Sequence, residues 1–288
     1  MEMFKAGHDI GCKQTGGRYR YNTVKPLNPE HVEQALRHYQ RKIPNCRCFL
    51  KKRDGKLWVC EDPNPEIDFE KSLASFTAKC RANGVTFNSG MEAVINTAIV
   101  EMAREAGVEG EAHHMSINLA TDLRRYMKRR PLPILGLHVR PTVHRMETPF
   151  DVRDNFWDYT RKLHQRLSVL LKSGEALQQS VVREMTLQQL PPVEHHAAGI
   201  VAHLDYGLIN VGDLTAVIPG VGEQLQQTDL AMIGCTHSFG FPMLHQIYTF
   251  RGHSPYTLAY DPSYMAKETA VVITDRILRL MHDLGTSP

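Results

Sequence analysis

The chain has 288 residues, of which 42% are hydrophobic and 23% are charged, and its formal net charge at pH 7 is +3. These values are typical of a soluble globular protein and exclude a disordered, collagen-like or coiled-coil chain. The small charge gives no reason to expect a nucleic-acid partner, and no apolar run reaches the ~18 residues of a membrane span.

The N-terminal sequence and the cysteines indicate the cellular compartment. The opening residues, MEMFKAGHDIGCKQ, lack the features of a signal peptide and of a transit peptide, so we expect a cytoplasmic protein. The six cysteines include no C-x-x-C pair and no spacing typical of a small secreted domain. Free thiols are therefore expected rather than disulfides.

The first part of the chain predicts little regular structure. Residues 11–24 are polar and contain glycine, which is typical of a loop. Asn28 and Pro29 predict the start of a helix of about three turns that ends before Pro44. A hairpin is then predicted over residues 46–60, because Asp-Gly at its centre is a strong turn signal.

From Phe69 onward, helices and strands are predicted in a mixed order. Apolar residues at three- and four-residue spacing predict helices near 69–80, 90–104, 152–173 and 264–283, with a Gln-rich helical stretch before Pro191. Strands are predicted at 116–120, 134–139, 199–204, 229–235, 243–250 and 255–261. This pattern predicts an α/β fold in which helices cover one mixed sheet.

Three motifs together resemble those of alcohol O-acetyltransferases. The first is S-I-N-L at 116–119 with D-L-R at 122–124, followed by Pro131 and L-G at 135–136. The second is G-L-I-N-V-G at 207–212, and the third is F-R-G-H at 250–253 with L-A-Y-D at 258–261 and the closing helix. The wider group includes condensation domains of peptide synthetases and polyketide-associated diacyltransferases.

The resemblance implies a fold of two chloramphenicol-acetyltransferase-like halves with a tunnel between them. Residues 71–288 resemble the C-terminal half, and residues 1–70 resemble a remnant of the N-terminal half. In that remnant, K-I-P-N-C-R at 42–47 resembles the family's r-H-P-x-L-R, with Ile43 in place of the histidine. We therefore expect a chloramphenicol-acetyltransferase-like mixed sheet with flanking helices and a truncated second half.

The family also carries a catalytic segment, H-H-x-x-x-D-G, whose second histidine is the general base. In this chain the segment is missing, as though Glu70 ran directly into Lys71. Loss of a positioned base costs on the order of 10²- to 10⁴-fold in rate. We therefore expect a member of the acyltransferase family with impaired catalysis. Two alternatives stay open: an active acyltransferase that uses His114, and a non-catalytic ligand-binding or regulatory module.

The histidine pairs imitate that segment poorly. In H-H-M-S-I-N-L, which begins at His113, Asn118 and Leu119 stand where the family has Asp and Gly. The pair His195-His196 departs further, so His114 is the one weak catalytic candidate.

The resemblance implies that Arg124, Asn210 and Gly212 lie beside the tunnel and position substrate. The basic run from Arg124 to Arg130 is either a solvated loop or an electrostatic aid for an anionic donor. No resident cofactor is expected, and the co-substrate would be acyl-coenzyme A or a carrier-bound thioester. The partners would be a small-molecule acyl donor and acceptor.

Two further expectations concern metal and association. Cys46, Cys48 and Cys60 lie on the predicted hairpin, where core packing explains them as well as zinc does, so no metal site is expected. A truncated N-terminal half would leave apolar surface exposed, which favours self-association.

Overall fold

The computed structural model describes residues 15–23, 69–127, 138–188, 204–215, 225–234, 236 and 241–287. Its α-helices are α2 (Phe69–Ala82), α3 (Phe87–Glu105), α4 (Phe156–Lys172), α5 (Glu175–Gln188) and α7 (Lys267–Thr286). Its strands are β1 (Thr15–Thr23), β2 (Ala112–Asp122), β3 (Val139–Pro149), β4 (Tyr206–Asp213), β5 (Leu225–Gly234), β6 (Met243–Thr249) and β7 (Tyr256–Tyr260). A short 3₁₀-helix, η1 (Leu123–Tyr126), follows β2.

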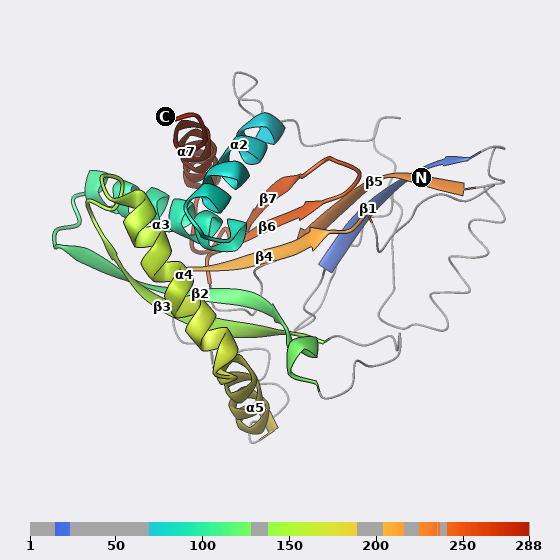
Figure 1. Ribbon diagram of the computed structural model, residues 1–288, viewed down its shortest axis with the longest axis horizontal. Coiled ribbons are helices and arrows are strands. Elements are labelled where there is room, and N and C mark those ends of the chain that lie inside the picture. Colours follow the sequence, from blue (N-terminus) through green and yellow to red (C-terminus); the bar gives the residue numbers. More distant parts are fainter. Residues whose placement is uncertain are drawn as a thin grey trace.

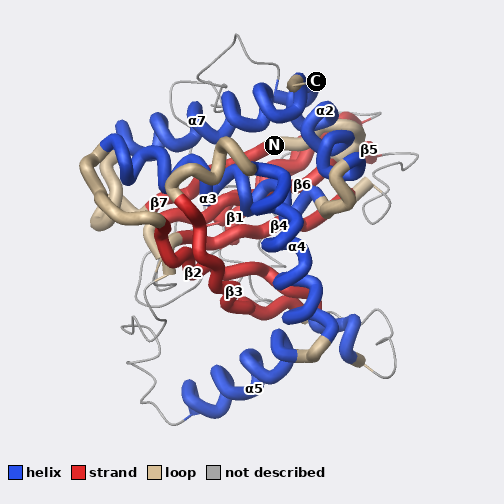
Figure 2. Tube along the Cα trace, turned by 60° about the vertical axis from the view of Figure 1, so that its left-hand side comes forward, coloured by secondary structure: helices blue, strands red, loops and turns tan. Residues whose placement is uncertain are grey.

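A mixed five-stranded sheet forms the centre of the molecule, in the order β3-β2-β4-β6-β7. Strands β2, β4 and β6 are parallel neighbours, whereas β3 and β7 pair antiparallel at the two edges. Helices α3, α4 and α7 cover one face, and α2 packs on α7 (Figures 1 and 2). The predicted α/β fold with a mixed sheet and flanking helices is confirmed.

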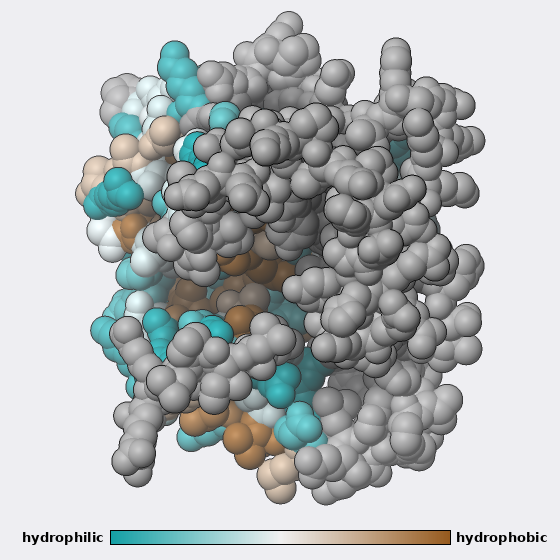
Figure 3. Space-filling view, turned by 90° about the vertical axis from the view of Figure 1, so that its right-hand side faces the viewer, coloured by the Kyte–Doolittle hydropathy of each residue, from teal (hydrophilic) through white to brown (hydrophobic). Residues whose placement is uncertain are grey.

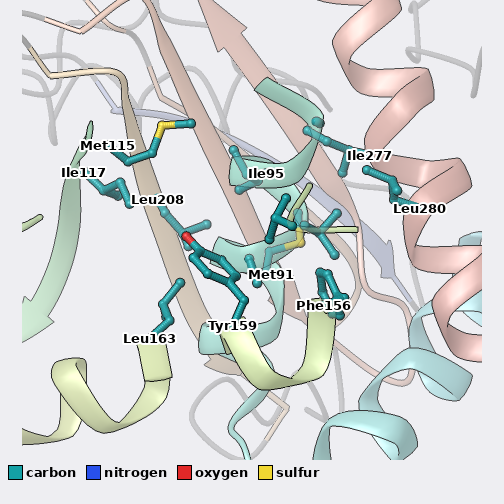
Figure 4. Close-up of a cluster of buried hydrophobic side chains, with 14 of the residues drawn as sticks. Met91, Ile95, Met115, Ile117, Phe156, Tyr159, Leu163, Leu208, Ile277 and Leu280 are labelled. Carbon is teal, nitrogen blue, oxygen red and sulfur yellow. The ribbon is translucent and has the colours of Figure 1, made fainter. Parts of the chain in front are cut away.

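The main core lies between these helices and the sheet (Figure 4). Helix α4 shows why it buries one face: its apolar residues recur every three or four positions. The core side chains labelled in Figure 4 come from α3 (Met91, Ile95), β2 (Met115, Ile117), α4 (Phe156, Tyr159, Leu163), β4 (Leu208) and α7 (Ile277, Leu280).

The prediction of a loop over residues 11–24 is wrong in its larger part. Residues Thr15–Thr23 form β1, which pairs antiparallel with β5 in a separate two-stranded sheet. The pairing partner lies more than two hundred residues away in sequence. Local composition therefore carries little of the signal, because strand formation depends on cross-strand neighbours.

Two strands of the larger sheet also differ from the predictions. The strand expected at 134–139 lies mostly outside the described residues, and β3 runs from Val139 to Pro149. Its buried face carries Thr142, His144 and Thr148, so the strand lacks apolar alternation. The strand expected at 199–204 lies outside the described residues except Leu204, and β4 begins at Tyr206. The helix and the hairpin expected within residues 28–60 also lie outside them.

Helix α5 lies against β3, the edge strand of the sheet (Figure 2). The side-chain amide of Gln179 pairs with the backbone of Val143 in the manner of a neighbouring strand. Val143 N donates to Gln179 Oε1 at 2.7 Å, and Gln179 Nε2 donates to Val143 O at 3.1 Å. One side chain thus satisfies both backbone groups at this point of the edge.

Buried polar side chains join α3 to the sheet and to α4. The hydroxyl of Tyr206 donates to Asn96 Oδ1 at 2.8 Å, and Asn96 Nδ2 donates to the Tyr159 hydroxyl at 2.8 Å. One turn earlier, Glu92 Oε1 lies 2.6 Å from His144 Nδ1, and both side chains are almost fully buried. These contacts fix the position of α3 over β3 and β4, because buried polar groups are costly when unpaired.

A second buried histidine lies on β6. His245 Nδ1 lies 2.6 Å from the Tyr256 hydroxyl, and the ring meets Tyr206 edge-on with a centroid distance of 5.2 Å. Burial lowers the pKa of His245 to about 3, because the charged ring would lose its hydration. The histidine is therefore neutral in the folded protein at mildly acidic pH.

This burial predicts acid sensitivity. In the unfolded chain His245 takes up a proton below pH ~6.5, while in the folded chain it stays neutral until about pH 3. Above pH ~6.5 His245 is neutral in both states and its burial does not depend on pH. Below that pH the unfolded chain binds a proton that the folded chain does not, so the free energy of unfolding falls by up to ~1.4 kcal/mol per pH unit. His245→Gln should make the free energy of unfolding less dependent on pH between about pH 4 and pH 6 by up to this slope. Denaturant titrations of both proteins measure it, and parallel pH profiles would contradict the assignment.

Figure 3 views the molecule from the side on which β1 and β5 lie. Apolar side chains of the described residues, in brown, are visible there beside polar ones in teal.

The domain division at residues 70 and 71 and the expected self-association stay predictions.

Candidate functional site

The carboxyl ends of two parallel strands meet at one edge of the sheet. Strands β2 and β4 are neighbours with Leu119 beside Leu208, so their following residues leave the sheet together. Asp122 ends β2, and Asn210 lies near the end of β4. The N-terminus of α3, capped by Thr86, and the C-terminal half of α4 complete the surroundings. Ligand sites of α/β proteins favour such strand ends.

Two adjoining pockets, here called the groove, occupy this place. Their volumes are about 580 Å³ and 800 Å³. They share Asn88, Arg125, Leu167 and Leu171 as lining residues, so they form one continuous depression. Leu167 and Leu171 of α4 form part of its wall, and both polar and apolar residues of α3, β2, η1 and β4 also line it.

The structure places Arg124, Asn210 and Gly212 at the groove. Asn210 Nδ2 donates to Asn88 Oδ1 at 2.8 Å, and Gly212 N donates to Asn210 Oδ1 at 2.9 Å. Gly212 has a φ of +80°, a backbone conformation that favours glycine. This turn therefore fixes the Asn210 amide against α3, and among the described residues the Asn88 amide nitrogen has no acceptor, so it can donate a hydrogen bond in the groove.

Basic side chains surround the groove. Arg124 is half-exposed, and its guanidinium Nη1 lies 3.2 Å from Asp122 Oδ1. Arg125 lines both pockets and Lys172 lines the larger one. Within the described part of the chain, neither Arg125 nor Lys172 forms an ion pair. The groove thus carries two cations that no described carboxylate pairs with, and their charge can attract an anionic ligand.

A serine and a histidine meet at the wall of the larger pocket. His164 of α4 lines this pocket, and its Nδ1 lies 3.0 Å from the hydroxyl oxygen of Ser89 on α3. Ser89 is fully buried, and its hydroxyl also lies 3.0 Å from Thr86 Oγ1. This pair ties α4 to the first turn of α3.

The structure does not bring His114 to the groove. His114 is exposed near the start of β2, opposite Glu147 of β3. It lies eight strand positions before Asp122, or about 26 Å at a rise of ~3.3 Å per residue. Its neighbour His113 has Nε2 at 3.2 Å from Asp205 Oδ1, and Asp205 Oδ2 accepts from Ser116 N. His195 and His196 lie outside the described residues.

The described residues contain neither a cluster of metal ligands nor a membrane-spanning helix. Across the described ranges, no three His, Cys, Asp or Glu side chains are grouped so as to hold a metal ion. No described helix combines the length and the apolar character needed to cross a bilayer. Cys46, Cys48 and Cys60 lie outside the described residues.

Comparison with known proteins identifies the fold. No protein-family model and no curated protein matches the chain. Among solved structures, the TRI3 trichothecene 15-O-acetyltransferase from Fusarium sporotrichioides has a TM-score of 0.58 at 11% identity, over 75% of this chain and 45% of that chain. The condensation domain from the Monacolin K polyketide synthase MokA has a TM-score of 0.52 at 12% identity, over 90% of this chain and 58% of that chain. The chain has the condensation-domain fold.

Other similar structures agree with this fold. The epimerization domain from the third module of tyrocidine synthetase B has a TM-score of 0.51 at 10% identity, over 75% of this chain and 45% of that chain. The chain therefore spans about half the length of the structures that it matches. The predicted chloramphenicol-acetyltransferase-like architecture is confirmed at the level of the fold, while the likeness to alcohol O-acetyltransferases in particular stays a prediction.

Sequence reasoning missed several groove residues. Asn88 lies just before the helix predicted near 90–104, and His164 and Lys172 lie within the helix predicted at 152–173, so no motif points to them. One signal for His164 exists: it follows the buried Leu163 directly and so borders the apolar face of α4. A titratable residue in that position can meet a partner on the neighbouring helix, as His164 meets Ser89 of α3.

Proposed function

We propose that this protein binds a phosphate-bearing acyl thioester, such as an acyl-coenzyme A, in the groove and serves in acyl transfer to an alcohol or amine. The observation that carries the proposal is the pair of cations, Arg125 and Lys172, beside the fixed amides of Asn88 and Asn210. Arginine and lysine are the residues that bind phosphate. The condensation-domain fold supports the same class of ligand.

The missing H-H-x-x-x-D-G segment favours a second candidate function. A protein with this groove and without that base would bind the thioester and turn it over slowly or not at all. Both candidates share the binding step, so binding is tested first.

Calorimetric titration with coenzyme A and with pantetheine tests the binding step. Coenzyme A carries the phosphates that pantetheine lacks, so it should bind about tenfold more tightly or better, since ~1.4 kcal/mol of charge-assisted hydrogen bonding is tenfold in affinity. The double variant Arg125→Gln/Lys172→Gln should lose this preference.

A matched control is available on α4. Arg161 is exposed and forms an ion pair with Asp158, outside the groove, so Arg161→Gln should leave the preference intact. Equal binding of both ligands by the wild-type protein, or no binding of either, would contradict the proposed function.

A further inference from the structure

A hydrogen-bonded chain of three side chains ends at the groove. Thr86 Oγ1, the helix cap of α3, accepts from Ser89 N at 3.3 Å and lies 3.0 Å from Ser89 Oγ. Ser89 Oγ in turn lies 3.0 Å from His164 Nδ1. Because Ser89 is fully buried, its hydroxyl has its hydrogen-bonding partners in Thr86 and His164.

The second ring nitrogen of His164 has a different environment. Within the described part of the chain, Nε2 of His164 has no hydrogen-bond partner, and it is not among the buried unpaired atoms. His164 lines the larger pocket together with Asn88, Asn210 and Gly212. The ring is therefore held at Nδ1, and no described residue occupies the hydrogen-bonding position of Nε2, on the wall where the proposed ligand binds.

We propose that His164 is the general base of this protein, with Ser89 as its positioning residue. This inference rests on the proposed function and adds the group that performs the chemistry. Nδ1–H donates to Ser89 Oγ, and the Ser89 hydroxyl donates to Thr86 Oγ1. In that tautomer Nε2 carries a lone pair that accepts a proton in the groove.

In the reaction Nε2 acts first as a base and then, once protonated, as an acid. The acceptor hydroxyl gives its proton to Nε2 while its oxygen forms a bond to the thioester carbonyl carbon, and the carbonyl π electrons move to oxygen. When that oxygen re-forms the double bond, the carbon–sulfur bond breaks and the leaving sulfur takes the proton from Nε2–H. The sum is alcohol plus thioester giving ester plus thiol, and the imidazole is regenerated. Asn88 lines the same wall, and its amide group, which has no acceptor among the described residues, can donate to the carbonyl oxygen.

A similar pair elsewhere shows that the location in the groove, and not the serine–histidine contact alone, supports the proposal. Ser72 of α2 lies 3.1 Å from His282 Nδ1 of α7, away from the groove. That pair joins two packed helices, and neither residue lines the groove. It therefore provides a matched control.

The decisive variant is His164→Asn. The asparagine amide can donate to Ser89 Oγ as Nδ1 does, so the contact between α3 and α4 is kept while the base is lost. With acetyl-coenzyme A and ethanol, 1-hexanol or benzyl alcohol, thiol release by the wild-type protein should exceed that of His164→Asn by 10²- to 10⁴-fold. Coenzyme A affinity should stay within about twofold. The control His282→Asn should match the wild type in both measurements.

Three further measurements separate a catalytic role from a structural one. Ser89→Ala should lower kcat with little change in KM, since it loosens the ring without touching the binding residues. Imidazole added to His164→Ala should restore part of the turnover. A two-bond ¹H–¹⁵N spectrum should show neutral His164 with its proton on Nδ1.

The outcomes distinguish the two proposals. If coenzyme A binds but the wild-type protein releases no thiol with any of these alcohols, the base assignment is wrong while the proposed binding stands. The base assignment is also wrong if His164→Asn retains wild-type turnover or if the spectrum shows the proton on Nε2. If coenzyme A does not bind, the proposed function itself is wrong.

Discussion

His144→Leu should destabilise the protein by about 3–5 kcal/mol, because it leaves the Glu92 carboxyl group buried and without its partner. The two side chains are 0% and 1% exposed, and Oε1 of Glu92 lies 2.6 Å from Nδ1 of His144. Urea unfolding followed by circular dichroism measures the loss as a lower midpoint. The contact connects α3 to the edge strand β3, so its removal should also loosen the first strand of the sheet.

The double variant Glu92→Met/His144→Leu is the control for this prediction. It replaces the pair with apolar side chains of similar size, and such replacements of buried pairs are often neutral or stabilising. The double variant should therefore recover most of the stability lost in His144→Leu. If it is less stable than the single variant, the loss comes from packing and not from an unpaired carboxyl group.

Asn96→Leu should cost about 2–4 kcal/mol, because it removes the partner of two buried tyrosine hydroxyls. Tyr206 would be left with a distant contact to the Glu92 carbonyl oxygen at 3.4 Å, while Tyr159 would keep its contact with Thr148 Oγ1 at 2.7 Å. Burial raises the pKa of both tyrosines, so neither hydroxyl escapes the cost by ionising.

A double-mutant cycle with Tyr206→Phe checks the assignment. In the Tyr206→Phe background the hydroxyl is absent, so Asn96→Leu should be less costly by about 1–2 kcal/mol. Strictly additive effects would show that the hydrogen bond between Asn96 and Tyr206 contributes nothing to the stability of the fold.

The fold was largely predictable from sequence where apolar periodicity is strong. Helix α4 repeats its apolar residues at helical spacing, and the structure places them in the core. Strand β3 was not predicted because its buried residues Thr142, His144 and Thr148 are polar. Their burial depends on partners that come from other elements, and periodicity does not record partners.

The groove was predictable only in part, for a related reason. Arg124 follows the end of β2, and Asn210 and Gly212 lie in the last residues of β4, where a motif can be recognised in one continuous segment. His164 gains its setting from Ser89, which lies 75 positions away in the sequence. A contact of this kind exists only after α3 and α4 have packed, so no local pattern predicts it.

The pairing of Gln179 with Val143 has a consequence for how this protein meets other copies of itself. A free edge strand invites addition of a further strand, which is a common first step of aggregation and of domain swapping. An incoming chain would have to displace both hydrogen bonds of the Gln179 amide before it could pair at Val143. A glutamine on a neighbouring helix thus protects the middle of β3 from intermolecular sheet growth, without a proline, a bulge or a charge on the strand at that position.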